Sequence, residues 1–435
     1  MSVTEGSELP NKYITYLIMV ATAGWALASY DLNLLVLALP QISRDLHLSQ
    51  TLVGLLGTIV YVAQFVLTIF VGSAMDRYGR KLVWMLCLAL AALFTGLTYF
   101  VQNYWQLALV RALASGLAFS ELAVSITIVN EQVPARWRGL LYSVVQGGWP
   151  LGVFLAAGVF LAFGHWGWRV VFLLGVLPIV AVMVGRLFIR ESERFEHLQD
   201  VRTAHRAGDR PRLDALLAQH DVDLNQIDRV SIGQLFSRDS PVVRRQVIML
   251  TIVWLFYSSS FVATNFYITS WLTSYKGFTE AETSVLLLVC GGIGFFFYIL
   301  GGWIGEVVGR RRVLIVTGVL TAPLNLAILF THGHVFIEIV YFFIYQATNG
   351  TWSGAGYAYQ GESFPTRVRG TAIGFLGAMQ VAGFVIGTAV WTSLIGTLGG
   401  STTWLVVAVG GSVGLWCTLL LRDIPPGQDL EAIAT

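Results

Sequence analysis

Long apolar runs separated by short polar stretches fill this chain of 435 residues. Twelve of these runs approach the length of roughly 20 apolar residues that a helix needs to cross a bilayer. A backbone that faces lipid must satisfy its own hydrogen bonds, so each run is predicted to be a transmembrane helix. The predicted limits are 13–40, 50–73, 82–101, 105–129, 140–163, 168–189, 246–273, 282–305, 312–331, 335–359, 370–396 and 401–421.

One longer polar stretch, residues 191–245, interrupts this pattern. It mixes arginine, histidine, aspartate and glutamate with leucines at helical spacing, which predicts a cytoplasmic linker with one or two surface helices. We therefore expect an N-terminal six-helix bundle over 1–190 and a C-terminal six-helix bundle over 246–435. The charges of the linker are those of a solvated face, and a regulatory or lipid-contacting role is the alternative.

Basic residues in the short connections predict how the chain is oriented. Arginine and lysine concentrate in the even-numbered connections, so the positive-inside rule places those connections and both termini in the cytoplasm. Residues 1–12 are polar and lack the features of a removable signal peptide, so the first helix is expected to be retained. The residues that set this orientation are Arg77, Arg80, Lys81, Arg136, Arg138, Arg310, Arg311, Arg312, Arg367 and Arg369.

The composition fits a membrane protein and argues against several other classes. The chain is 55% hydrophobic and 12% charged, whereas a soluble domain has about 25% charged residues. Its net charge of +2 gives no reason to expect nucleic-acid binding, and without a P-loop we do not expect ATP to drive it directly. No cofactor, metal or enzyme activity is expected, because no histidine lies mid-membrane and the three cysteines lack metal-ligand spacing.

Two motifs occur twice in the chain. Glu-x-x-Pro-x-Arg-x-Arg-Gly runs over 131–139 and again over 362–370. Gly-x-x-x-acid-x-x-Gly-Arg-basic runs over 72–81 and again over 302–311. The second copy of each motif follows the first at nearly the same distance along the sequence. This indicates that the chain contains an internal repeat of one unit. A duplicated membrane bundle is typical of proteins that move a solute across a bilayer.

The 72–81 motif, which follows the second apolar run, resembles the best-known loop signature of the major facilitator superfamily. The resemblance extends over essentially all the predicted spanning segments. It implies an all-α fold of twelve transmembrane helices in two six-helix halves, which alternate access to a central site. It also implies a multi-pass protein of the inner or plasma membrane that works as a monomer on a small-molecule substrate.

A narrower resemblance begins in the fourth run. Arg111, Gly116, Glu121 and Glu131 have the spacing found in metabolite and carboxylate proton symporters, and Tyr30 with Asp31 resembles the acidic site of sialate and aromatic-acid symporters. These features imply proton-coupled symport of a small organic anion, such as a monocarboxylate, sugar acid or aromatic acid. A sugar or polyol proton symporter and a proton-driven exporter remain alternatives, and a transporter-like membrane sensor is an alternative of another class.

Three charged residues within the runs are candidates for proton coupling. Asp31 should lie within the bilayer, where burial disfavours a charged carboxylate and a nearby cation favours it, so that it can gain and lose a proton. Arg111 lies at comparable depth and is its expected partner, and it could also grip a substrate carboxylate with two hydrogen bonds. Glu121 is a second buried acid. The alternative for each residue is a static structural role.

Polar and aromatic side chains in other runs could contact the substrate or join helices. The candidates for substrate binding are Arg111, Gln146, Asn265, Tyr267, Tyr341, Tyr345, Gln346, Asn349 and Gln380.

The repeated loop motifs are candidates for a gate. An acid of each motif is expected near the exposed amides at a helix start, which favours a carboxylate and would brace the state that is open to the outside. Signalling of topology alone is the alternative. The candidates for gating are Gly72, Asp76, Arg77, Gly79, Arg80, Glu131, Arg136, Arg138, Glu306, Gly309, Arg310, Glu362, Arg367 and Arg369.

Overall fold

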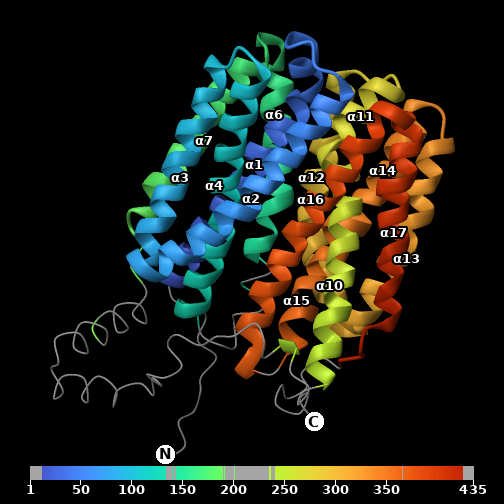
Figure 1. Ribbon diagram of the computed structural model, residues 1–435. Coiled ribbons are helices and arrows are strands. Elements are labelled where there is room, and N and C mark those ends of the chain that lie inside the picture. Colours follow the sequence, from blue (N-terminus) through green and yellow to red (C-terminus); the bar gives the residue numbers. More distant parts are fainter. Residues whose placement is uncertain are drawn as a thin grey trace, which may run out of the picture.

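The computed structural model describes residues 12–133, 141, 144–189, 191, 200, 235–236, 241–364 and 366–424. Within these ranges all regular secondary structure is helical, and the helices run roughly along one common direction (Figure 1). This confirms the expected all-α membrane fold.

The first helix group, drawn in blue to green in Figure 1, contains the elements that carry the candidate ion pair. Within it, α1 packs along α6, α4 and α7, while α3 packs along α4 and α7. The central position of α1 explains why its middle section is buried on all sides, polar residues such as Asp31 included. The elements are α1 (Lys12–Asp45), α2 (Gln50–Tyr78), α3 (Arg80–Leu97), η1 (Thr98–Phe100), α4 (Tyr104–Gln132), α6 (Gly148–Phe163), η2 (Gly164–Trp166) and α7 (Trp168–Arg186).

The second helix group, drawn in yellow to red, contains three π-helical segments, η4, η5 and η6. Such segments often mark functional sites in helices. The elements are α10 (Pro241–Phe261), η4 (Val262–Phe266), α11 (Ile268–Tyr275), α12 (Glu280–Val308), α13 (Arg310–Phe330), α14 (His334–Tyr345), η5 (Gln346–Trp352), α15 (Ser353–Glu362), α16 (Thr366–Trp404), η6 (Leu405–Val409), α17 (Gly410–Gly414) and η7 (Leu415–Leu420).

Nine helical stretches in the described part of the chain are long and apolar enough to cross a membrane. The last of them, Thr371–Leu420, contains two of the expected runs, which meet where Gly399 has a non-helical backbone with φ 73°. Two further expected runs fall on α4 and on α14–η5–α15. The count of twelve crossings and the location of the termini stay predictions.

Glycines at equivalent places in the two helix groups end one helix and begin the next. Gly79 separates α2 from α3 with φ 100°, and Gly309 separates α12 from α13 with φ 101°. A positive φ is strained for residues with a Cβ atom, so the motif requires glycine at these two turns. The repeat seen in the sequence is therefore also a repeat of backbone geometry.

The two helix groups meet mainly where α2 packs against α16 and α6 packs against α12. We name the two ends of the bundle by their turns: the 46–49 end carries the turn between α1 and α2, and the Gly79 end carries the turn between α2 and α3. Gln41 and Glu280 are hydrogen-bonded across the groups, so α12 begins at the 46–49 end and reaches Gly309 at the Gly79 end.

Candidate functional site

A buried ion pair joins two helices of the first group. Asp31 of α1 accepts hydrogen bonds from Arg111 of α4, with Nη2 at 2.6 Å from Oδ2 and Nη1 at 3.2 Å from Oδ1. Both side chains are 0% exposed. The two-pronged geometry uses the planar fork of the guanidinium, which an ammonium group cannot reproduce.

Polar neighbours complete the surroundings of this pair. Thr95 of α3 donates a hydrogen bond to Asp31 Oδ1 at 2.6 Å. Ser115 lies between the two charges, at 3.2 Å from Arg111 Nη2 and 3.4 Å from Asp31 Oδ2. The guanidinium carbon lies 4.6 Å from the ring centroid of Phe172 on α7. The pair is thus held by four helices of one group.

The complete burial of both charges makes the two residues depend on each other. A buried charge that loses its partner costs about 3–5 kcal/mol. A proton on Asp31 would remove the negative charge that compensates Arg111, so the guanidinium would need other acceptors. Each of the two charges therefore depends on the other for compensation within the bundle.

A second site is the cavity between the two helix groups. Its free volume is about 40 Å³, the space of one or two water molecules. A substrate therefore requires side chains to move or the groups to separate further. The cavity is lined by Trp25, Phe119, Gln146 and Trp149 from the first group, and by Tyr257, Phe261, Tyr298, Asn349, Ser353, Tyr357, Gln380 and Phe384 from the second.

Aromatic rings form most of the cavity wall. The ring of Trp25 lies 5.0 Å from that of Trp149 and 5.6 Å from that of Phe119. Trp149 also faces Phe261 of the other helix group, with ring centroids 6.1 Å apart. Such faces favour planar, conjugated molecules through stacking and edge contacts.

Amide groups supply the polar part of the wall. Gln380 donates from Nε2 to the hydroxyl of Tyr357 at 2.8 Å. Asn349 donates from Nδ2 to Asn265 Oδ1 at 2.9 Å, which links the π-helical segments η4 and η5. The buried Asn349 Oδ1 has no hydrogen-bond partner among the described residues, so this amide has capacity for a ligand.

The structure brings only some of the predicted substrate residues to the cavity. Gln146, Asn349 and Gln380 line it. The other six, which include Arg111, are not among its lining residues. Two of the six donate their hydrogen bonds elsewhere: Tyr341 donates to the carbonyl of Thr264 at 2.8 Å, and Gln346 donates to that of Cys290 at 3.1 Å.

Tyr267 joins the two helix groups, which is one of the two roles predicted for these side chains. Its hydroxyl donates to the carbonyl of Gly54 in the other helix group at 2.7 Å, and its ring stacks on Trp391 at 4.6 Å. It therefore belongs to the contacts that join the two groups. Tyr345 and Asn265 are buried nearby without lining the cavity.

Contacts between the two groups close the 46–49 end. Arg44 forms an ion pair with Glu280, and Gln41 donates to the same carboxylate at 2.7 Å. Deeper in the bundle, the hydroxyl oxygens of Thr58 and Thr392 lie 3.2 Å apart. A solute could not pass this end without breaking these contacts.

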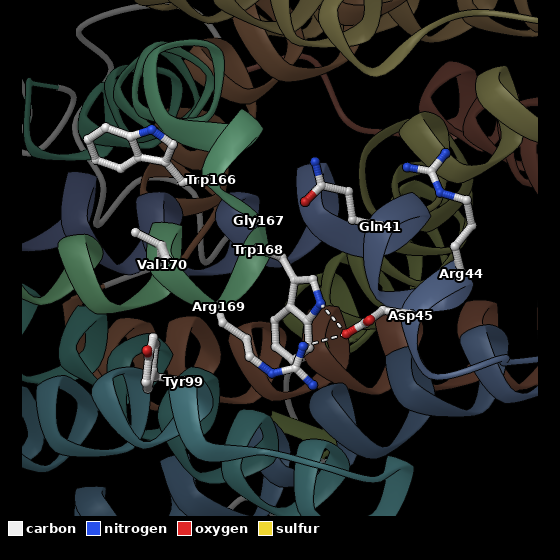
Figure 2. Close-up of a pocket in the computed structure, with 9 residues that line it drawn as sticks. All are labelled: Gln41, Arg44, Asp45, Tyr99, Trp166, Gly167, Trp168, Arg169 and Val170. Carbon is white, nitrogen blue, oxygen red and sulfur yellow. Dashed lines mark hydrogen bonds and ion pairs between the residues drawn. The ribbon is translucent and has the colours of Figure 1, made fainter.

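A surface pocket of about 640 Å³ lies beside this closed end (Figure 2). In Figure 2 the carboxylate of Asp45 faces both Arg169 and the indole nitrogen of Trp168, which lies 3.1 Å from Oδ2. The other arginine of the pocket, Arg44, is paired with Glu280. Because its cations are already engaged, we assign this pocket to the closed end rather than to substrate binding.

The gating candidates cluster at the Gly79 end where they are described. Arg310 pairs with both Glu306 and Glu362, which brings together the two motifs of the second repeat. In the first repeat, the backbone amides of Arg80 and Lys81 donate to Glu191 at 3.2 and 3.0 Å. Glu191, which was not among the predicted residues, thus caps the start of α3.

Several predicted residues cannot be placed in this way. Arg77 is described and lies with its guanidinium 5.4 Å from the ring of Tyr78. The backbones of six others lie on α2, α4 and α16, but their surroundings fall outside what the structure describes: Gly72, Asp76, Glu121, Glu131, Arg367 and Arg369. Arg136 and Arg138 lie outside the described residues altogether.

Sequence reasoning missed the aromatic wall of the cavity. Trp25, Phe119, Tyr257 and Phe384 occur in apolar runs where aromatic residues are equally common on lipid-facing surfaces. Trp149 was the one with a usable signal, because it follows two glycines and precedes Pro150 near Gln146. Such a cluster of special residues within a membrane helix often marks a close approach or a site.

A bundle of membrane-spanning helices, with a buried ion pair in one half and a cavity between two helix groups, is the arrangement of a transporter and not of an enzyme. A family model described as the Major Facilitator Superfamily matches residues 21–305 and 249–434. The chain belongs to this superfamily and is a multi-pass membrane protein.

Individual relatives agree with this assignment. The chain is 26% identical over 411 residues to the niacin transporter NiaP of Acinetobacter baylyi, covering 91% of this chain and 87% of the relative. It is 27% identical over 392 residues to the cis,cis-muconate transport protein of the same species, covering 88% and 85%. The crystal structure of a D-xylose-proton symporter superposes with a TM-score of 0.72 at 18% identity, covering 95% of this chain and 99% of the symporter, which shows the common fold.

Proposed function

We propose that this chain is a proton-coupled symporter that takes up a small organic acid with a planar, conjugated framework. In this proposal twelve helices form two halves, 1–190 and 246–435, joined by a cytoplasmic linker over 191–245. Both termini lie in the cytoplasm, as the positive-inside rule favours. A monomer alternates access to the cavity between the halves, using protons and no ATP or other cofactor.

The observation that carries proton coupling is the fully buried pair of Asp31 and Arg111. Burying an acid and its counter-charge in the bilayer interior costs free energy. Ionisable residues at such positions are therefore rare and usually belong to a functional site. In the second helix group, Asn325 occupies the place on α13 that Thr95 occupies on α3. Its Nδ2 donates to Ser412 Oγ at 2.9 Å, a neutral contact. The contact that Thr95 makes with a carboxylate is therefore replaced by a neutral contact in the second group.

A short structural path connects this pair to the cavity. Ser29, two residues before Asp31 on α1, donates to the carbonyl oxygen of Trp149 at 2.7 Å. Trp149 lines the cavity, as does Trp25 on the same helix as Asp31. A shift of α1 that follows protonation of Asp31 would therefore move cavity residues, and a ligand that moves those residues would alter the pair. Such reciprocity is what coupling requires.

Two observations support a planar organic acid as the substrate. The cavity wall combines aromatic faces with the amides of Gln146, Asn349 and Gln380. A second N–H of Gln380 could donate to a carboxylate, and Asn349 Oδ1 could accept from a protonated carboxyl group or a ring N–H. The niacin and muconate transporters among the relatives carry names of conjugated acids. Arg111 is assigned to Asp31 and not to the substrate, because it is fully buried and does not line the cavity.

The direction of opening follows from the proposed orientation. With the Gly79 end in the cytoplasm, the closed 46–49 end would separate the central cavity from the outside in this state. The gating role of the repeated motifs would belong to the opposite state, in which the Gly79 end is closed. We propose that role for the motif residues named above.

The test uses the purified protein in liposomes with an imposed inward proton gradient. The probes are cis,cis-muconate and nicotinate as acids, and xylose and gluconate for the alternative substrate classes. We expect the acids to accumulate above their equilibrium level, with proton uptake reported by a trapped pH dye. Protein-free liposomes correct for passive entry of the neutral acids, and a protonophore should abolish the accumulation.

The outcomes separate the parts of the proposal. Acid accumulation that is unchanged by the protonophore would refute proton coupling. Accumulation of xylose with no uptake of either acid would refute the substrate class and favour a sugar symporter.

A further inference from the structure

A third cavity, of about 320 Å³, opens on the surface at the Gly79 end. It lies where α10 begins and η7 ends, and it shares no lining residue with the central cavity. Its lining residues are Val242, Arg245, Gln246, Leu420, Leu421 and Arg422. Two arginine side chains, both exposed, thus share one small cavity.

Buried hydrogen bonds hold the walls of this cavity in place. Gln246, which is 6% exposed, donates from Nε2 to the hydroxyl of Tyr359 at 2.7 Å and to Ser363 Oγ at 3.2 Å. Tyr359 in turn donates to the carbonyl oxygen of Arg422 at 2.6 Å. The backbone of Arg422 is therefore tied through α15 to the helix that carries Arg245.

Arginines outnumber acids among the described residues around the cavity. Arg311 adds a third guanidinium beside it, since its Nη2 donates to the carbonyl oxygen of Leu419 at 2.9 Å. Arg244 precedes Arg245 on α10 and is also exposed. Among the described residues, the exposed Asp423 is the acid that follows Arg422 in the sequence. Like charges that converge in this way repel one another, and an anion between them would relieve the repulsion.

Apolar residues continue from the cavity along the same two elements. Leu420 is 57% exposed and Trp416 is 44% exposed on η7, while Ile248 of α10 is 40% exposed. Apolar side chains exposed on a membrane protein face acyl chains, and tryptophan is enriched where acyl chains meet head groups. The arginines therefore stand at the polar edge of a lipid-facing seam, where α10 and η7 pack against each other (Figure 1).

We propose that this cavity binds the phosphate of an anionic phospholipid from the leaflet at the Gly79 end. Arg245 and Arg422 would contact the phosphate, because guanidinium groups form paired hydrogen bonds with its oxygens. The acyl chains would lie along Ile248, Trp416 and Leu420. Basic cavities between helices on the cytoplasmic side are suited to anionic head groups. The proposal goes beyond substrate transport and does not depend on proton coupling.

The test compares lipids on the full-length protein purified in a mild detergent. Cardiolipin, phosphatidylglycerol, phosphatidylcholine and inorganic phosphate are added separately, and the melting temperature and the lipids retained in native mass spectrometry are recorded. The two anionic lipids should raise the melting temperature by roughly 2 °C or more, since a ligand of the folded state stabilises it. Phosphatidylcholine and inorganic phosphate should not reproduce this shift.

A matched set of variants assigns the effect to the cavity. The double variant Arg245→Gln with Arg422→Gln should lose the shift and the retained lipid. Arg244→Gln removes an equally exposed neighbouring charge that does not line the cavity, and it should keep both. If the double variant proves unstable, Arg245→Lys is measured in its place. This variant keeps the positive charge and should retain part of the melting-temperature shift.

Three results would overturn the proposal. The double variant could respond to anionic lipid as the unmodified protein does. Inorganic phosphate could give the same shift as cardiolipin, which would indicate a site for soluble anions. Phosphatidylcholine could be retained as strongly as phosphatidylglycerol, which would show that the negative charge of the lipid is not recognised.

Discussion

Asp31 Oδ2 lies 2.6 Å from Arg111 Nη2, and both side chains are completely buried among helices of the first group. The two residues come from α1 and α4, so their attraction ties together the helix that carries Trp25 and the helix that carries Phe119. Both aromatic residues line the central cavity. We therefore expect a change in the charge of Asp31 to shift the positions of these two cavity residues.

Asp31→Asn should separate proton coupling from substrate exchange. Asparagine keeps the shape of the side chain and can still accept a hydrogen bond, but it cannot bind and release a proton. We expect proton-driven accumulation in liposomes to be lost, while exchange of labelled for unlabelled substrate across the membrane partly survives. The remaining exchange should also lose its dependence on pH.

Asp45→Asn is the matched control for this variant. Asp45 is another aspartate of α1 that pairs with an arginine, but its side chain is 47% exposed at the 46–49 end. Accumulation should be nearly normal in this control. Normal proton-driven accumulation by Asp31→Asn would remove Asp31 from the coupling mechanism.

The stability of the buried pair can be measured with a double-mutant cycle. Arg111→Met leaves the carboxylate of Asp31 buried without its counter-charge, which should cost about 3–5 kcal/mol. Adding Asp31→Asn removes that stranded charge, so the double variant should regain much of the stability. Thermal or denaturant unfolding of the purified proteins gives the free-energy difference. Losses that simply add would show that the two residues do not interact energetically.

Two amides on the same π-helical segment should behave differently when they are removed. Asn349 lines the cavity, whereas Gln346 donates to the carbonyl of Cys290 and does not line it. Asn349→Ala should weaken substrate binding by about tenfold, the effect of one lost hydrogen bond of about 1–1.5 kcal/mol. Gln346→Ala should lower the melting temperature and leave the dissociation constant nearly unchanged. Equal affinities in the two variants would mean that Asn349 does not contact the substrate.

Much of the fold could be read from the sequence because the physical rules for membrane helices are strict. A lipid-facing backbone must be helical, so the apolar runs predicted the helices within a few residues. The repeated glycines Gly79 and Gly309 were recognisable because each is part of a longer repeated motif. A charge in an apolar run needs a partner, and for Asp31 the arginine at matching depth on another run was Arg111.

The cavity was much harder to predict. Which face of a helix meets the other helix group depends on packing angles, and apolar periodicity does not distinguish that face from one that meets lipid. Trp25 and Phe384 therefore looked like ordinary members of their runs. The partner of Tyr267 could not be predicted for another reason: its contact with Gly54 joins the two helix groups and belongs to a closed end, which the sequence of either group alone does not reveal.

The glycine at position 152 should be required for the packing of α6 on α1. A Cβ atom at Gly152 would lie 2.6 Å from the Cβ atom of Ser29 and 2.7 Å from the backbone nitrogen of Tyr30. Gly152→Ala should therefore destabilise the protein by about 1–3 kcal/mol through overpacking. It should also reduce transport, since Ser29 and Tyr30 directly precede Asp31.

Gly158→Ala provides the comparison on the same helix. A Cβ atom there would meet only Leu288, at an ordinary contact distance of 3.7 Å. This substitution should be neutral or slightly stabilising, because alanine favours a helix more than glycine does. If both variants unfold at the same temperature as the unmodified protein, the close approach of α6 and α1 is not tight.

A cross-link at the closed end should arrest the transport cycle reversibly. The hydroxyl oxygens of Thr58 and Thr392 lie 3.2 Å apart in different helix groups, close enough for cysteines at these positions to be oxidised to a disulfide after small adjustments. With Cys417 replaced by serine, Thr58→Cys with Thr392→Cys should lose transport on mild oxidation and regain it on reduction, because the 46–49 end can no longer open. Thr58→Cys alone should transport normally under both conditions. Full activity of the fully cross-linked protein would show that this end does not separate during transport.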